Sequence, residues 1–288
     1  MIVLTVLGGV LAGCGSPEAT RARTAARPTP SEEPSATPTS PRAPESGPPV
    51  QAPGPGGLTP VFERRADGSA ARNGAAAADK VVALTFDADM TADQGPRAAA
   101  GERFDNPALI ASLRRLKVPS TVFMTGRWAQ EYPAQARSIG TDPLFEIANH
   151  SFSHYAFSSP CYGLPTVEKE DMRGDVERAF TAIRETGARH VVPYFRFPGG
   201  CYDDASLKAL APTGVTAVQW DVVSGDAFAT DADAVAEQVL AGVEPGSLVV
   251  MHCTRSAAPV TDEALRRIVP ELRGRGYRFV KVSELMRD

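Results

Sequence analysis

Residues 80–89, KVVALTFDAD, join a run of apolar and β-branched side chains to two carboxylates. The run has the length and composition of a strand, and it is too apolar for a strand with one face in water. Side chains two residues apart lie on the same face of a strand, so Asp87 and Asp89 would point the same way. The stretch therefore predicts a buried parallel strand that carries two carboxylates at its carboxyl end.

Further segments of this kind follow, and helical patterns separate them. Asn106 stands where a helix N-cap is expected and Pro107 at the first helical position, while Gly187 suits a helix C-cap. We expect strands at 120–126, 145–150, 194–197, 216–222, 247–252 and 278–282, and helices at 106–116, 128–140 (broken by Pro133), 167–187, 203–214, 231–243 and 261–276. About seven such units in roughly 210 residues predict a closed or nearly closed α/β barrel with a parallel sheet.

In such a barrel the chemistry lies at the carboxyl ends of the strands, which we call the mouth. Five polar residues fall at these ends although they are far apart in the chain: Asp87, His150, Arg196, Asp226 and His252. His150 and His154 are half of the chain's 4 histidines, and on a helical backbone both would face one metal ion. They could instead be a hydrogen-bonded pair on a partly buried turn. The other polar residues expected at the mouth favour the metal site.

The first 78 residues differ in composition from the rest. Residues 1–13, MIVLTVLGGVLAG, are too short to span a bilayer and have the layout of a secretory signal peptide. LAGC at 11–14 resembles the lipobox of bacterial lipoproteins, although no Lys or Arg precedes the apolar run. It implies a lipidated Cys14 as the only membrane attachment. Residues 14–78, rich in Pro, Ala, Ser and Thr, predict a disordered tether, and 79–288 one globular domain. The net charge of −4 gives no reason to expect nucleic acid as a partner.

Five short segments occur in the order and at the spacing of a known motif set: TFDAD at 85–89, HSFSH at 150–154, RFPGG at 196–200, WDVVSGDAF at 220–228 and VMH at 250–252. Together they resemble the polysaccharide deacetylases of the NodB-homology type, carbohydrate esterase family 4. The resemblance covers residues 80–288. It implies a distorted (β/α)7 barrel that hydrolyses an N-acetyl amide, or an O-acetyl ester, on a sugar polymer.

The resemblance also implies a role for each matching residue. Asp87 would be the general base, held ionised by Arg196. His252 would be the general acid, oriented by Asp226, and the backbone N–H of Gly199 would contribute to the oxyanion site. From the residues alone, His252 could be a core histidine and Asp226 a simple cap. Gly199 and Ala227 replace aromatic residues of the family motifs, which implies an altered sugar-binding groove.

A divalent ion, Zn²⁺ or Co²⁺, is the cofactor that the resemblance implies. Such an ion lowers the pKa of a bound water to about 7, and catalytic zinc has three protein ligands and an open position. His150 and His154 supply two ligands. The family's third ligand is an aspartate at the position of Ala88, and we expect Asp89 to replace it. A role swap between Asp87 and Asp89, or a weakened or absent metal site, are the alternatives.

We therefore expect a monomeric, membrane-anchored, extracytoplasmic lipoprotein that deacetylates peptidoglycan or a chitin-like polymer. Ala88 motivates an alternative, a metal-poor, catalytically weakened carbohydrate-binding surface lipoprotein. A glycosidase that pairs Asp87 with Asp89 or Asp226 ranks last, because it leaves both histidines without a role.

Three cysteines, Cys161, Cys201 and Cys253, each follow one of these segments. An extracytoplasmic protein can form a disulfide, and three pairings are open. We prefer Cys161–Cys201, which would join two loops at the mouth. A catalytic Cys253 is not expected, because neighbouring strand residues point to opposite faces.

Overall fold

The computed structural model describes residues 47–66 and 80–287. Its centre is one sheet of parallel strands in the order β1-β6-β5-β4-β3-β2-β8-β7, with β9 paired to β2. The strands are β1 (Val61–Phe62), β2 (Val81–Ala88), β3 (Ser120–Met124), β4 (Phe145–Asn149), β5 (Val191–Phe195), β6 (Thr216–Val218), β7 (Val222–Val223), β8 (Ser247–His252) and β9 (Arg278–Phe279). Among the described strands the path begins at β1 and ends at β7, which confirms the expected distorted (β/α)7 barrel.

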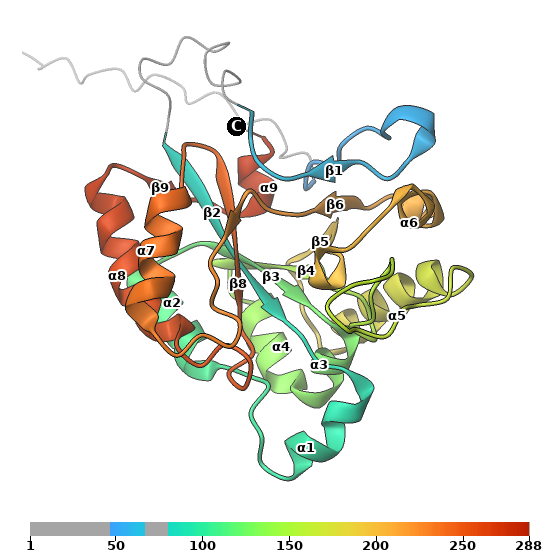
Figure 1. Cartoon of the computed structure of the whole chain (residues 1–288), viewed down its shortest axis with the longest axis horizontal. Helices are drawn as coiled ribbons and strands as arrows, with labels where there is room; N and C mark the ends of the chain where they lie inside the picture. Colours follow the sequence, from blue (N-terminus) through green and yellow to red (C-terminus); the bar gives the residue numbers. More distant parts are fainter. Residues whose placement is uncertain (1–46, 67–79, 288) are drawn as a thin grey trace, which may run out of the picture. The chain divides into compact units, whose positions relative to one another are not determined.

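Helices connect the strands, and most of them lie outside the sheet (Figure 1). They are α1 (Gly95–Ala99), α2 (Pro107–Leu116), α3 (Gly126–Glu131), α4 (Pro133–Gly140), α5 (Met172–Glu185), α6 (Asp204–Leu210), α7 (Ala232–Gly242), α8 (Thr261–Gly274) and α9 (Val282–Leu285). The expected cap is present, because Asn106 Oδ1 accepts a hydrogen bond of 3.1 Å from the Leu109 N–H. Pro133 separates α3 from α4, as a helix-breaking residue should.

Strand β2 shows how the sheet divides two apolar clusters. Its even-numbered side chains from Val82 to Ala88 pack with the outer helices, including α7 and α8. Val81 and Ala83 point to the other face and pack inside the barrel, where Leu285 of α9 joins them. Because Val81 and Ala83 are near the amino end of β2, this packing lies away from the mouth. Apolar side chains thus cover both faces of β2, as the sequence predicts.

Residues 47–66, which we expected to belong to the tether before residue 79, pack with the compact unit that contains the sheet. β1 pairs with β6, with Val61 opposite Ala217, and Phe62 is buried. The Gln51 N–H also donates to Thr216 Oγ1 at 3.0 Å. A short apolar pair within a Pro-rich stretch is enough to satisfy the free edge of β6. The signal peptide at 1–13, Cys14 and most of the expected tether lie outside the described residues.

The single strand expected at 216–222 forms two strands, β6 and β7, on different parts of the sheet. Between them, the buried guanidinium of Arg196 donates to the carbonyls of Val218 (Nε, 3.1 Å) and Gln219 (Nη2, 3.4 Å). These bonds satisfy backbone oxygens where the chain leaves β6. Over the described ranges, we find no helix with both the length and the hydropathy to span a bilayer.

Candidate active site

The polar residues predicted for the mouth do lie at the carboxyl ends of their strands. Asp87 is the penultimate residue of β2 and pairs in register with His252, the last residue of β8. His150 directly follows β4, Arg196 directly follows β5, and Asp226 comes shortly after β7. Parallel strands bring these positions to one edge of the sheet, although the chain separates them widely.

Asp87 is held as an anion by a buried cation. Its Oδ1 accepts a hydrogen bond of 2.7 Å from Arg196 Nη1, and neither side chain is more than 5% exposed. Burial alone would raise the pKa of the Asp87 carboxyl. The adjacent guanidinium and nearby imidazoles outweigh that effect and hold the pKa below its ordinary value. Arg196 Cζ lies 3.8 Å from the centroid of the Phe123 ring, so this ring packs against one face of the guanidinium and holds it in place.

His252 and Asp226 form a second charged pair. His252 Nδ1 lies 2.7 Å from Asp226 Oδ1, and the His252 backbone N–H donates to Asp226 Oδ2 at 2.7 Å. Ser224 and Thr261 donate two further hydrogen bonds to the same carboxylate. Burial by itself lowers the pKa of His252, but the Asp226 carboxylate more than compensates and raises it to about 10. The pair therefore presents a protonated imidazole whose side chain is 23% exposed.

The two histidines of HSFSH approach each other on a tight loop and not on the helical backbone we considered. Ser151 and His154 have φ of 70° and 57°, in the left-handed region. The His154 N–H donates to Ser151 Oγ at 2.8 Å. This turn places the two ring centroids 5.1 Å apart. The loop thus achieves the convergence that i, i+4 spacing would give on a helix.

The ring of His150 is oriented by the backbone. Its Nδ1 lies 2.9 Å from the Arg196 carbonyl oxygen. A carbonyl only accepts hydrogen bonds, so Nδ1 carries a proton, and Nε2 is the ring nitrogen that faces the mouth. His150 Nε2 points to Asp87 Oδ2 at 3.6 Å. Burial lowers the pKa of His154 to about 4, which leaves its imidazole neutral. The neutral form of His154 is the form that binds a metal ion.

Asp89 faces the histidine loop, and Ala88 does not. Ala88 is fully buried among the outer apolar side chains, on the face of β2 opposite to Asp87. Asp89 Oδ2 lies 3.7 Å from His154 Nε2. Asp89 Oδ1 accepts a hydrogen bond from the Thr254 hydroxyl. The Asp89 backbone N–H donates to Thr254 Oγ1 at 3.2 Å. Thr254 was not singled out in the sequence, because a threonine two residues after a strand end carries no motif.

The donor set suits a divalent ion in type. Two ligands bound to zinc at 2.0–2.1 Å with a tetrahedral angle would be about 3.4 Å apart, close to the Asp89–His154 separation. Within 47–66 and 80–287, however, no three His, Cys, Asp or Glu side chains are gathered tightly enough to hold an ion as placed. His150, His154 and Asp89 are the residues that would hold the ion.

Gly199 lies in a short 3-10 turn, Pro198–Gly200, with φ of 64°. A Cβ at this position would come within 2.6 Å of Cys161 Sγ, so the close approach requires glycine.

Cys161 and Cys201 form a disulfide, which confirms the preferred pairing. Cys253 is a buried free thiol, and burial raises its pKa to about 12. It packs in the outer cluster, as its strand position predicts.

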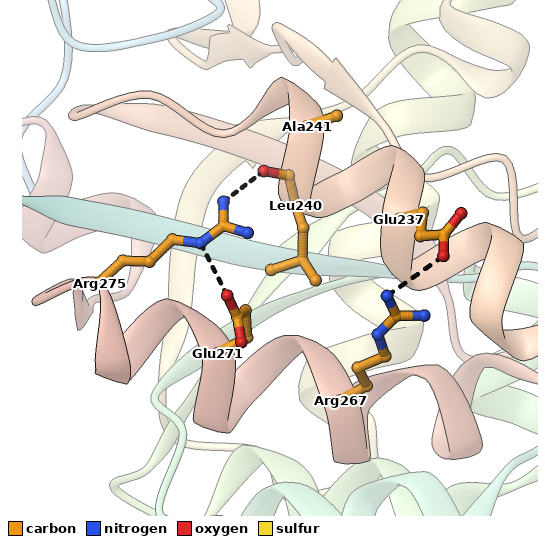
Figure 2. A pocket seen from close by; sticks show the side chains of 6 residues that line it. All are labelled: Glu237, Leu240, Ala241, Arg267, Glu271 and Arg275. Carbon is orange, nitrogen blue, oxygen red and sulfur yellow. Dashed lines mark hydrogen bonds and ion pairs between the residues drawn. The ribbon is translucent and has the colours of Figure 1, made fainter.

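A surface hollow between α7 and α8 is separate from this site (Figure 2). Its charged side chains are already paired: Arg267 Nη2 donates to Glu237 at 3.2 Å, and Arg275 Nε to Glu271 at 3.2 Å. Arg275 Nη1 also donates to the Leu240 carbonyl oxygen at 2.6 Å. The Arg267–Glu237 pair and the Arg275–Leu240 hydrogen bond connect the two helices, and we assign the hollow no ligand.

Comparisons with known proteins identify the family of this chain and its fold. Residues 74–218 match the family model described as polysaccharide deacetylase. A chitooligosaccharide deacetylase from Sinorhizobium fredii is 30% identical over 198 residues, 65% of this chain and 86% of that protein. A peptidoglycan-N-acetylglucosamine deacetylase from Bacillus cereus is 28% identical over 212 residues, 73% of this chain and 89% of that protein. The fold is similar to that of a carbohydrate esterase family 4 pseudoenzyme from Bacillus anthracis, with a TM-score of 0.60 and 23% sequence identity. The match covers 78% of this chain and 68% of that protein.

Proposed function

The chain belongs to the polysaccharide deacetylase family, and from this premise we propose a metal-dependent deacetylase that acts on a cell-wall polymer containing N-acetylglucosamine. The observation that carries the proposal is the direction of Asp89. Its carboxylate faces His154 at 3.7 Å, so a carboxylate stands beside the histidine pair even though the usual ligand position is Ala88.

The protein side chains account for the proton transfers of amide hydrolysis. Asp87, kept ionised by Arg196, accepts a proton from the water whose oxygen attacks the acetyl carbonyl carbon. The N–H of Gly199 would stabilise the oxygen that gains negative charge. His252, protonated and oriented by Asp226, then donates a proton to the amide nitrogen as the C–N bond breaks. Acetate and a free amino sugar are the products.

A divalent ion, Zn²⁺ or Co²⁺, would polarise the carbonyl oxygen and lower the pKa of the attacking water when bound. His150 and His154 would hold it through Nε2 and Asp89 through a carboxylate oxygen. The Nδ1 hydrogen bond of His150 and the Thr254–Asp89 hydrogen bond would fix two of these ligands, as outer contacts do at metal sites.

The cell-wall substrate rests on two further arguments. The two relatives are named for chitooligosaccharide and for peptidoglycan N-acetylglucosamine, which share the acetylated amino sugar. The sequence around Cys14 suggests a lipid-anchored, extracytoplasmic protein, and the cell wall is the polymer within reach of such an anchor.

Release of acetate tests the proposal. Purified protein with Zn²⁺ or Co²⁺ is incubated with acetylated chito-oligosaccharide or with peptidoglycan. Acetate is expected from at least one of them, and its absence from both with metal confirmed as bound would refute the proposal.

Metal binding tests the ligand assignment separately. Asp89→Ala should weaken zinc binding more than 100-fold, and Thr254→Val by about 10- to 100-fold. Competition with a chromophoric chelator measures both. Asp93→Ala is the matched control. Asp93 is an exposed aspartate near the site in sequence, and its carboxylate accepts a hydrogen bond from the Thr91 hydroxyl. Unchanged affinity in Asp89→Ala would contradict the assignment.

Ala88 also favours a second candidate, a metal-poor carbohydrate-binding surface protein. The B. anthracis neighbour is itself described as a pseudoenzyme. This candidate predicts binding of chito-oligosaccharide with no stoichiometric metal and no acetate release, so the two experiments above separate it from the hydrolase.

A further inference from the structure

Tyr162 is an aromatic side chain that the fold itself does not use. The residue is 89% exposed, so its ring adds almost nothing to the apolar core. It lies in a tight turn in which the Leu164 N–H donates to the Cys161 carbonyl at 2.8 Å. Both central residues have positive φ, 47° at Tyr162 and 76° at Gly163. A bulky residue in the left-handed region costs free energy, so the turn is built at the expense of stability.

The turn holds this ring over the proposed oxyanion loop. A Cβ placed on Gly199 would lie 3.3 Å from Tyr162 Cδ2 and 3.4 Å from Leu164 Cδ1. The ring therefore lies in the space that a side chain at 199 would take. Exposed on its other side, it forms a wall beside Gly199.

The Cys161–Cys201 disulfide fixes that position. It ties the residue before Tyr162 to the residue that follows the Pro198–Gly200 turn, across 40 positions of sequence. Beneath the loop, Phe157, Phe195 and Phe197 pack ring against ring, with centroids 4.9–5.5 Å apart. The base of the loop is thus held in place, while the ring of Tyr162 faces solvent.

We infer that Tyr162 is a sugar-stacking residue that binds a pyranose ring of the polymer beside the acetyl group being removed, and that the disulfide is its positioning device. The C–H face of a pyranose is apolar and covers an aromatic ring well, while the phenol hydroxyl can meet sugar hydroxyls. This inference rests on the proposed function, because it places the ring relative to Gly199.

Steady-state kinetics with chito-oligosaccharide test the stacking role. Tyr162→Ala keeps the same backbone strain and removes only the ring. We expect its KM to rise about tenfold with kcat nearly unchanged, and Tyr162→Trp to restore binding. Val50→Ala, at an exposed apolar residue outside the loop, is the control and should match wild type. A KM unchanged in Tyr162→Ala, with an active wild type, would overturn the inference.

The positioning role is tested by a double-mutant cycle. Replacing both Cys161 and Cys201 by serine, or reducing the wild-type protein with dithiothreitol, should raise KM to a similar extent. In the Tyr162→Ala background the same treatment should add little, because the ring is already gone. Fully additive effects would show that the disulfide acts on something other than Tyr162.

Direct binding keeps this inference distinguishable from the proposed function. Calorimetry of chito-oligosaccharide with Asp87→Asn protein measures affinity without turnover. An inactive wild type would refute the deacetylase, while a tenfold loss of affinity on Tyr162→Ala would still support stacking. Equal affinities with and without the ring would refute stacking whether or not the wild type is active.

Discussion

The Asp226 carboxylate accepts hydrogen bonds from the His252 backbone, from Ser224 and from Thr261, and it also faces the His252 ring. So many donors around one buried group keep it ionised, and the anion in turn keeps the imidazole protonated. At the residue scale, this pair determines the pH range in which His252 can act as an acid.

Replacing Asp226 should therefore move the alkaline limit of activity. A general acid works below its pKa, so the wild-type activity assigned to His252 is lost as pH rises through about 10. Asp226→Asn removes the neighbouring anion, and the limit should fall by about 1 to 3 pH units. The pH profile of kcat/KM measures it. An unchanged alkaline limit would show that His252 is not the group that titrates.

Ala88 offers a second residue-scale prediction. By the family's first motif, Ala88→Asp would restore the aspartate at the usual ligand position. In the structure, Ala88 packs among apolar side chains with Phe86 and Met90, on the face away from Asp87. We expect this variant to lose about 3 kcal/mol of stability without binding zinc more tightly, because it buries an unpaired carboxyl group. Urea unfolding and zinc titration test both statements, and tighter zinc binding would contradict them.

At the scale of elements, helix α5 supports the histidine loop. Asp175, 1% exposed, accepts hydrogen bonds from the N–H groups of Phe152 (2.6 Å) and Ser153 (3.4 Å). Asn149 Nδ2 donates to the Val176 carbonyl at 2.8 Å, and its Oδ1 accepts from the Ser151 N–H at 2.8 Å. The left-handed turn that brings His150 and His154 together thus depends on a helix that holds neither of them.

Asp175→Ala should loosen this loop. We expect zinc affinity to fall about tenfold and stability to fall by about 2 kcal/mol, because two loop N–H groups lose their acceptor. Asp171→Ala is a suitable control, since the Asp171 side chain makes no capping bond at the start of α5. Chelator competition and urea unfolding are the measurements. Wild-type zinc affinity in Asp175→Ala would show that the loop holds its shape without the helix.

At the scale of the whole molecule, residues 47–66 are part of the folded unit. Phe62 is 8% exposed and packs inside the barrel with Val218. The segment also covers the edge of β6, which would otherwise have unpaired backbone groups.

Phe62→Ala should accordingly lower the free energy of unfolding by about 3 kcal/mol, since it leaves a cavity at the sheet edge. Val50→Ala in the same segment removes an exposed side chain and should change it by less than about 0.5 kcal/mol. Urea unfolding followed by circular dichroism compares the two. Similar values would indicate that the segment contributes little to the fold.

The sequence alone was sufficient for the alternation of strands and helices, the barrel class, and the set of polar residues at the strand ends. Apolar periodicity and helix caps are local properties, so they can be read without coordinates. It was also sufficient to prefer the Cys161–Cys201 disulfide, because both residues adjoin segments expected at the mouth.

Only the tertiary structure decided what depends on contacts between distant segments. These include the non-helical turn of HSFSH, the split of 216–222 around Arg196, the pairing of β1 with β6, and the hydrogen bond from Thr254 that directs Asp89. Each of these features depends on a contact between groups more than about 20 residues apart in the chain. No local sequence pattern specifies which distant group will be the partner.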